Sequence, residues 1–257
     1  GAVTGAPPLR RPQEIARTLE GVGGGQHGDG TSEAAKEHRI EVVVRDERPA
    51  ALQHHRALHG PHDTHRPSGE RATTDYRRRM PEEPPTIGIC GSGTMGAGLV
   101  EVAARAGLPV IVRGRSDDSN ARLVAAMTAS MARQVAKQKL AQDDMVVALS
   151  RVRTTTSIGQ LDQCDLVIES IVEDLDAKLE LVAELGGVLK PEAIVATNTS
   201  TLSVEALAQR SGRPGRMVGI HFFNPATTMP LVEVVRAAST SDETVAAAES
   251  FARRCGK

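Results

Sequence analysis

Residues 86–116 constrain the fold of this chain more than any other stretch. An apolar run ends at Cys90, the turn Gly91-Ser-Gly-Thr-Met-Gly96 follows, and an alanine-rich segment leads to a second apolar run, Val110–Val112. This order predicts a strand, a glycine turn, a helix and a second strand. A G-x-G-x-x-G turn between a strand and a helix is typical of a site for the pyrophosphate of a dinucleotide.

The three glycines of this turn have separable expected roles. Gly91 allows the tight turn out of the strand, Gly93 lets the backbone approach a pyrophosphate, and Gly96 lets the helix pack closely on the strand. The helix expected to open at Met95 directs its free N–H groups and its positive dipole end toward the same pyrophosphate.

Composition excludes several classes of protein. The net charge of −1 argues against nucleic acid or an anionic membrane as the main partner. Cys90, Cys164 and Cys255 lie far apart without metal-ligand spacing, which indicates reduced thiols in an intracellular protein. Because the sequence has no apolar run of membrane-spanning length and no signal-peptide pattern, we expect a cytoplasmic location.

Residues 1–84 differ from the rest of the chain. They are rich in Gly, His, Arg and Pro and have little apolar periodicity, so we expect a disordered or poorly packed extension of low order. Residues 40–44 resemble a short strand but have no obvious partner. Met80 is a reasonable native start, so residues 1–79 are interpreted as an upstream extension with no part in the fold. Seven of the eight histidines lie here, in a spacing that fits no tetrahedral site, and no metal is expected.

Residues 85–257 alternate between apolar strands and helices, and the sequence predicts one dinucleotide-binding domain. Further strands are expected at residues 151–155, 165–169, 193–196, 217–220 and 231–235, and helices at residues 120–140, 175–189, 204–209 and 241–254. The predicted class is α/β, with a doubly wound, mostly parallel sheet of Rossmann type covered by helices on both faces. Ligands bind at the carboxyl ends of such strands. Polar clusters follow several of these strands: Gly91–Gly96, Glu169–Glu173, Asn198–Thr201 and His221–Asn224.

The end of the second strand indicates which dinucleotide binds. NAD sites place an acidic residue about 20 residues after the glycine turn, to bind the ribose 2′-OH. That position is Gly114, flanked by Arg113 and Arg115, with Ser116 next. Two guanidiniums and a hydroxyl suit a 2′-phosphate, so NADP is the expected cofactor, with NAD possible. Solvated arginines, or a carboxylate supplied by residues 117–118 from a longer loop, are the alternatives.

His221 is the sole histidine outside the first 84 residues, and it follows an apolar strand. Glu233 lies in the next apolar strand, where a lone carboxylate is costly to bury. The two are expected to form a base and the carboxylate that orients it. The alternative is a core histidine bonded to backbone and an edge-strand Glu in water.

Four motifs in order resemble the 3-hydroxyacyl-CoA dehydrogenase family. They start at Gly91, Val167, Thr197 and His221, and read GSGTMGAG, VIESIVE, TNTS and HFFNP, the last followed by PLVEV from Pro230. The similarity runs from about Pro85 to the last residue. It implies hydride transfer between a nicotinamide and C3 of a 3-hydroxyacyl-CoA, as in the short 3-hydroxybutyryl-CoA type.

The resemblance also implies roles for individual residues. His221 matches the general base and Glu233 its supporting carboxylate, and Ser200 and Asn224 match residues near the substrate oxygens and the nicotinamide. Glu173 and Lys178 match cofactor contacts. The full set expected to bind the cofactor is Gly91, Gly93, Thr94, Met95, Gly96, Arg113, Arg115, Ser116, Glu173, Lys178, Asn198, Ser200 and Asn224.

Two departures from the family pattern keep alternatives open. The family has an acidic residue where Gly114 stands, and its members continue past Lys257 into a helical domain that forms a homodimer and closes over the acyl chain. The expected partner is an acyl-CoA substrate, with a homodimer only where that domain is present. The alternatives are a sugar-acid dehydrogenase of the same fold and an inactive nucleotide-binding fragment.

Overall fold

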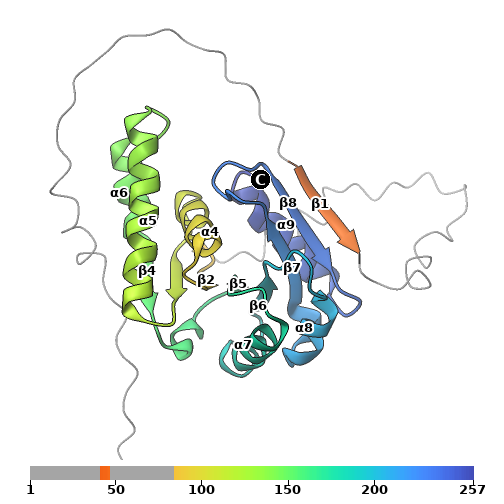
Figure 1. Ribbon diagram of the computed structural model, residues 1–257. Coiled ribbons are helices and arrows are strands. Elements are labelled where there is room, and N and C mark those ends of the chain that lie inside the picture. Colours follow the sequence, from red (N-terminus) through yellow and green to blue (C-terminus); the bar gives the residue numbers. More distant parts are fainter. Residues whose placement is uncertain (1–40, 47–83) are drawn as a thin grey trace, which may run out of the picture.

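The computed structural model describes residues 41–46 and 84–257, which contain an eight-stranded sheet in the order β1-β8-β7-β6-β5-β2-β3-β4 (Figure 1). Strands β2 to β7 run parallel, β8 is antiparallel to β7, and β1 is parallel to β8. The strands are β1 (Glu41–Asp46), β2 (Ile87–Cys90), β3 (Val110–Arg113), β4 (Val152–Thr155), β5 (Leu166–Glu169), β6 (Ile194–Thr197), β7 (Met217–Phe222) and β8 (Leu231–Arg236).

Helices connect the strands. They are α4 (Thr94–Arg105), α5 (Asp117–Ala136), α6 (Gln142–Ser150), α7 (Leu175–Val188), α8 (Val204–Arg210) and α9 (Asp242–Arg254), with 3-10 turns η2 (Ile158–Leu161) and η3 (Pro214–Arg216). Helices α4 and α9 cover one face of the sheet, with α5 and α6 packed on α4, and α7 and α8 cover the other face (Figure 1).

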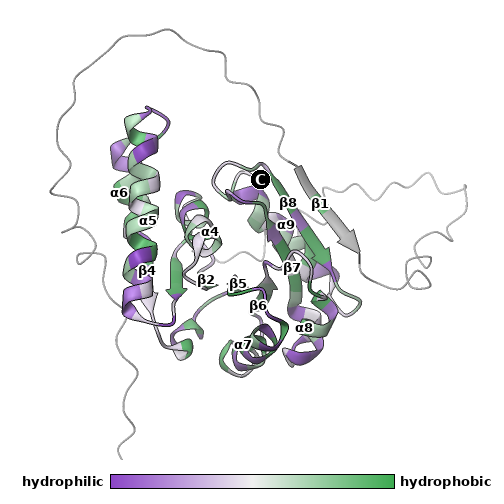
Figure 2. Ribbon diagram, in the orientation of Figure 1, coloured by the Kyte–Doolittle hydropathy of each residue, from purple (hydrophilic) through white to green (hydrophobic). Residues whose placement is uncertain are grey.

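The central strands are apolar along their whole length because helices bury both of their faces. Strands β2, β5 and β6 consist entirely of buried residues, and Figure 2 shows the apolar positions concentrated in the sheet. The small side chains of α4 let it lie close to the sheet, and Ala103 and Ala104 are fully buried. The core is mainly aliphatic, with Phe222 and Phe251 as its aromatic side chains in the described residues.

Chain order reverses direction between β2 and β5, since β3 and β4 lie on one side of β2 and β5 to β7 on the other. In open parallel sheets a crevice forms beyond the carboxyl ends of the strands at such a switch point. The doubly wound, mostly parallel fold expected from the sequence is confirmed.

One predicted helix is wrong in its extent. Instead of a single helix over residues 120–140, α5 ends at Ala136, and α6 occupies residues 142–150, where no element was expected. The break has no glycine or proline: Gln138 takes a φ of 56°, a left-handed conformation that glycine usually provides. The N-cap of α6, Ala141, makes no side-chain capping bond. The sequence therefore contains no helix-stop signal at the end of α5 and no N-cap signal at the start of α6.

The interpretation of residues 41–46 is also corrected. They were assigned no partner and no part in the fold, but β1 forms a six-pair parallel ladder with β8, from Glu41 opposite Leu231 to Asp46 opposite Arg236. β8 would otherwise be an edge with unpaired backbone groups, and such an edge accepts an extended segment through main-chain bonds that no side-chain pattern announces. The seven histidines of the first 84 residues lie outside the described residues.

Within residues 41–46 and 84–257, no helix combines the length and apolarity needed to cross a membrane. The same ranges contain no group of three His, Cys, Asp or Glu side chains placed to hold a metal ion.

Candidate active site

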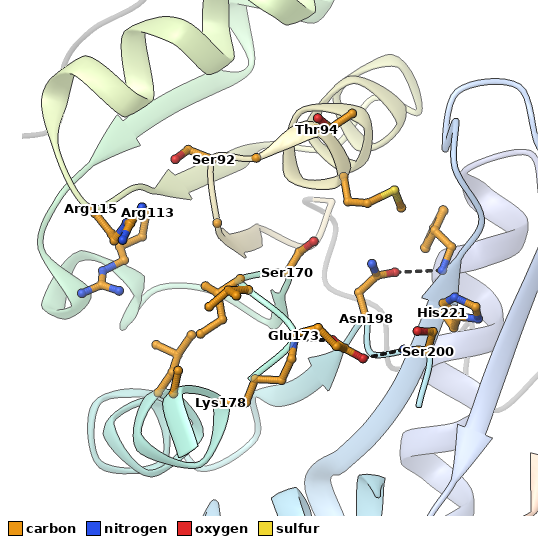
Figure 3. A pocket seen from close by; sticks show the side chains of 18 of the residues that line it. Ser92, Thr94, Arg113, Arg115, Ser170, Glu173, Lys178, Asn198, Ser200 and His221 are labelled. Atoms are coloured by element: carbon orange, nitrogen blue, oxygen red, sulfur yellow. Dashed lines mark hydrogen bonds and ion pairs between the residues drawn. The ribbon is translucent and has the colours of Figure 1, made fainter. Parts of the chain in front are cut away.

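A cavity of about 930 Å³ opens at the carboxyl ends of the central strands (Figure 3). Its walls come from the glycine turn, the end of β3, the loop after β5, helix α7, and the ends of β6 and β7. The residues that line it are Gly91, Ser92, Gly93, Thr94, Met95, Arg113, Arg115, Ser170, Ile171, Val172, Glu173, Ala177, Lys178, Glu180, Leu181, Glu184, Asn198, Ser200, His221, Phe222, Phe223 and Asn224.

The glycine turn has the geometry that a bound pyrophosphate needs. Gly91 has a φ of 126°, and a Cβ there would lie 2.3 Å from the carbonyl oxygen of Ser170. A Cβ on Gly96 would lie 2.1 Å from the carbonyl oxygen of Gly91, so helix and turn touch through backbone. Gly93 faces open space, with no atom within 4 Å of its Cβ position. It is the N-cap of α4 without a side-chain capping bond, so the helix start faces the cavity.

Two guanidiniums stand at one end of the cavity and His221 at the other (Figure 3). Arg113 is half-buried, its Nε is buried without a hydrogen-bond partner, and Arg115 is exposed. Ser116 lies outside the cavity wall: it is the N-cap of α5, and its Oγ accepts a 3.2 Å bond from the backbone N–H of Ser119.

The floor beneath the loop after β5 is held by a buried ion pair. Lys178 is 1% exposed and Glu169 is fully buried, and their Nζ and Oε1 atoms lie 2.6 Å apart. The other oxygen of Glu169 accepts a 2.7 Å bond from the hydroxyl of Thr197. A buried carboxylate with an ammonium, a hydroxyl and the backbone N–H of Ile171 as donors is fully satisfied, which a buried charge requires.

Glu173 connects the β5 loop to the β6 loop. Its Oε1 accepts bonds from the hydroxyl of Thr199, the backbone N–H of Ser200 and the hydroxyl of Thr201, and its Oε2 lies 3.3 Å from Nζ of Lys178. Burial alone would raise the pKa of Glu173, but these hydrogen bonds and the charge of Lys178 outweigh it and hold the pKa below its usual value. Glu173 is therefore ionised at neutral pH, and its hydrogen bonds and ion pair fix its carboxylate without a ligand.

Asn198 joins the ends of β6 and β7. Its Oδ1 accepts a 2.8 Å bond from the backbone N–H of Phe222, next to His221. Its own backbone N–H donates to the carbonyl oxygen of Glu169 at 2.9 Å. Ser200 lies near His221 in Figure 3, and Asn224 lines the same cavity.

His221 and Glu233 form a pair across two antiparallel strands. They are directly opposite in the β7–β8 ladder, and Nδ1 of His221 lies 2.9 Å from Oε2 of Glu233. The histidine side chain is 17% exposed and that of the glutamate 9%. The ring of Phe223 lies 4.5 Å from the imidazole, centroid to centroid. With Nδ1 engaged, Nε2 is the ring nitrogen left for a substrate proton.

The turn after Asn224 is held from two sides. Nζ of the buried Lys257 donates to the carbonyl oxygens of Ala226 and Met229 at 2.6 and 2.8 Å. On the other side, a Cβ on Gly98 of α4 would lie 3.1 Å from Cβ of Ala226. Two elements distant in sequence therefore fix the segment that carries Asn224.

Sequence reasoning gave no individual role to several residues that shape the site. Glu169 and Thr199 lie in the polar clusters expected at the strand ends, but neither they nor Thr197 were named as site residues, although Glu169, like Glu233, is a carboxylate in an apolar strand. The described cysteines are free thiols, and burial raises the pKa of Cys90 to about 12. Cys90 is therefore no nucleophile at the cavity floor.

A Rossmann sheet, a glycine turn at the switch point and a cavity that runs from this turn to His221 are the features of a dinucleotide-binding domain. The family profile "3-hydroxyacyl-CoA dehydrogenase, NAD binding domain" matches residues 86–257. The chain belongs to the 3-hydroxyacyl-CoA dehydrogenase family.

Relatives and solved structures agree with this assignment. The chain is 42% identical over 171 residues to a 3-hydroxybutyryl-CoA dehydrogenase of Bradyrhizobium diazoefficiens. The aligned residues cover 66% of this chain and 58% of that protein. A probable 3-hydroxybutyryl-CoA dehydrogenase of Deinococcus radiodurans is 40% identical, covering 66% and 61%. The crystal structure of an (S)-3-hydroxybutyryl-CoA dehydrogenase from Ralstonia eutropha superposes with a TM-score of 0.67 at 38% identity, over 68% of this chain and 62% of that one. The chain thus spans about three fifths of the length of these relatives.

Proposed function

We propose that this chain is the nucleotide-binding part of an oxidoreductase that transfers a hydride between a nicotinamide dinucleotide and C3 of a 3-hydroxyacyl-CoA, such as 3-hydroxybutyryl-CoA. The observation that carries the proposal is the His221–Glu233 pair at the end of a cavity that starts at the glycine turn. The open space at Gly93 and the start of α4 fit a pyrophosphate.

The residues supply the proton chemistry. In the tautomer of His221 that donates its Nδ1–H to Glu233, Nε2 carries no proton and can take the proton of the 3-hydroxyl group. As that proton leaves, the C3–O bond becomes a carbonyl and the C3–H electron pair departs as hydride. A bound oxidised nicotinamide supplies the hydride acceptor. Ser200 and Asn224 stand beside His221 to orient the substrate oxygen.

The end of β3 favours NADP(H) over NAD(H). Arg113 and Arg115 face the cavity, and no residue of the segment 114–118 presents a carboxylate to it. The acidic residues in the wall, Glu173, Glu180 and Glu184, come from the loop after β5 and from α7. A guanidinium bond to a 2′-phosphate contributes roughly 1.5–3 kcal/mol, which corresponds to about tenfold or more in affinity.

The reaction is tested by reduction of acetoacetyl-CoA, followed through oxidation of NADPH or NADH, with a sugar acid as the competing substrate. The proposal expects turnover of the acyl-CoA and none of the sugar acid. Binding of neither NADPH nor NADH in fluorescence titrations would remove the basis of the proposal.

The cofactor preference predicts the effect of Arg115→Ala. The variant is expected to bind NADPH about tenfold or more weakly, while its affinity for NADH changes little, because NADH has no 2′-phosphate. Arg153→Ala is the matched control, since Arg153 lies on β4, bonds Gln163 and is outside the cavity wall. Equal losses for both nucleotides would contradict the 2′-phosphate contact.

Two further expectations belong to this proposal. A cytoplasmic location and a homodimer formed through a further helical domain suit an enzyme of this family, and cross-linking of the full-length protein tests the dimer.

A further inference from the structure

Gly114 lies between the two cavity arginines and is buried. Glycine is favoured where φ is positive, but Gly114 is not among the described glycines with positive φ, which are Gly91, Gly107, Gly212 and Gly256. Its backbone conformation therefore does not itself require glycine. Something other than backbone conformation keeps a side chain off this position.

The space for a side chain at position 114 is filled by the first turn of α5. A Cβ there would lie 2.1 Å from Oδ1 of Asn120, 2.9 Å from its Cγ and 2.7 Å from Oγ of Ser119. Distances under 3.0 Å are essentially never seen for real Cβ atoms. Even alanine at this position requires Asn120 and Ser119 to move, and an aspartate requires a larger movement.

The blocking side chains are held in place. Asn120 is 2% exposed, and its Nδ2 donates a 3.0 Å bond to the carbonyl oxygen of Thr155, which also accepts the backbone N–H of Gly114 at 3.1 Å. Oγ of Ser119 is fixed by two bonds to the backbone of Ser116. The amide of Asn120 therefore cannot rotate away without leaving the Thr155 carbonyl.

Oδ1 of Asn120 is buried and makes no hydrogen bond. A buried acceptor without a donor is destabilising by about 1–3 kcal/mol. The bond to Thr155 accounts for the amide nitrogen but not for the oxygen, which points at the position where a 2′-hydroxyl-binding carboxylate would have to start.

We propose that Asn120 is a specificity-determining residue of the dinucleotide site: its amide keeps position 114 free of any side chain, which bars an acidic residue and leaves Arg113 and Arg115 to meet the 2′ substituent. Asn120 acts through Gly114 and does not itself contact the cofactor. The claim about nucleotide preference rests on the proposed function. The claim that Asn120 blocks position 114 does not depend on it.

A thermal-unfolding cycle tests the structural half without any cofactor. Gly114→Ala is expected to lower Tm by several degrees, whereas in the Asn120→Ala background the same substitution lowers Tm much less. Gly187→Ala is the control, because Gly187 lies in α7 with no atom within 4 Å of its Cβ position, and Tm should stay or rise. Equal effects of Gly114→Ala in both backgrounds would overturn the proposal.

Ser119 is tested in a separate experiment, because its Oγ also approaches position 114. The cycle is repeated in the Ser119→Ala background, where the proposal expects Gly114→Ala to remain strongly destabilising. If Ser119→Ala alone restores Tm, the assignment to Asn120 is wrong.

Fluorescence titrations with NADH and NADPH test the specificity half. Gly114→Asp alone is expected to bind neither nucleotide better than the wild type, whereas Gly114→Asp combined with Asn120→Ala should shift the NADH/NADPH affinity ratio toward NADH by about tenfold or more. A full switch by Gly114→Asp alone would refute the role of Asn120. If the wild type binds neither nucleotide, the proposed function fails, while the unfolding cycle still decides whether Asn120 closes position 114.

Discussion

His221 and Glu233 sit opposite each other in an antiparallel ladder, so strand pairing alone brings their side chains to one face of the sheet. Apart from Arg236 at the end of β8, which pairs with Asp242, the two strands are otherwise apolar, so His221 and Glu233 each have the other as a partner within reach. The pair is therefore set by register, and a slip of one residue would separate it.

His221→Ala is expected to lower kcat for acetoacetyl-CoA reduction by on the order of 10²–10⁴-fold, since that is the usual contribution of a general base. Glu233→Gln should lower it less, because the imidazole stays in place but loses its orienting charge. NADPH affinity, measured by fluorescence, should change little in either variant. Glu243→Gln is a matched control, as Glu243 pairs with Arg216 on the surface. An undiminished kcat in His221→Ala would exclude it as the base.

Glu173 gives a pH-dependent prediction. Its pKa in the folded protein lies below the ordinary 4.5, so its ionised form adds stability above that pH and this stability is lost as pH falls through the lowered pKa. The Tm difference between wild type and Glu173→Gln should therefore be largest near neutral pH and shrink below about pH 4.5. Calorimetry across pH measures it, with the exposed Glu192→Gln as control. A difference that grows in acid would contradict the assignment.

The residues that sequence reasoning found are those whose chemistry is unusual for their position. A single histidine after an apolar strand, a glutamate inside one, and arginines in place of an acid are visible in the chain alone. Asn120 and the Lys178–Glu169 pair are not, because their roles depend on distances between segments set only by packing. Residue type was enough to predict the chemistry of the site. Which polar groups bond to each other and which stay exposed to the cavity depends on tertiary contacts.

Helices and strands were predictable where the spacing of apolar residues and the turn or cap residues at the ends indicate the same element. Strands β2, β5 and β6 are short apolar runs closed by polar clusters, and their expected bounds differ from the observed ones by a residue or two. The α5–α6 break lacks such a turn residue, because Gln138 takes the turn conformation that glycine normally signals. Pairing of β8 with β7 in the antiparallel sense is likewise a matter of backbone geometry.

Helix α7 depends on a distant arginine at its carboxyl end. The guanidinium of Arg213 donates from Nη1 to the carbonyl oxygens of Lys190 and Ala193, and from Nη2 to those of Gly186 and Leu189, at 2.8–3.2 Å. The last carbonyls of a helix lack intrahelical donors, so one planar group replaces several caps. Through α7, this contact also supports Lys178 under the cavity.

Arg213→Met should destabilise the chain by roughly 2–4 kcal/mol, because several half-buried carbonyl oxygens lose a charged donor at once. Arg213→Lys should recover little, since one ammonium cannot span four carbonyls. Urea unfolding measures both, with the exposed Arg210→Met of α8 as control. A loss no larger than that of Arg210→Met would show that other donors or water cap α7.

At the scale of the molecule, β1 covers the edge of β8 beside the His221–Glu233 pair. Its half-buried Val43 is in register with Glu233, whose other neighbour is His221. By pairing with β8, β1 satisfies backbone groups that an open edge would leave unpaired. Residues 41–46 are therefore linked to the His221–Glu233 pair through strand β8.

Hydrogen–deuterium exchange tests that coupling. In a chain that begins at residue 47, the amides of β8 that face β1 should exchange markedly faster, whereas a chain that begins at residue 41 should keep their protection, because it retains the ladder. The amides of β5, in the middle of the sheet, serve as the internal control. If β8 exchanges equally in both chains, β1 contributes nothing to the edge. If it exchanges faster and kcat also falls, the edge strand supports the His221–Glu233 pair, because that pair's carboxylate belongs to the strand being released.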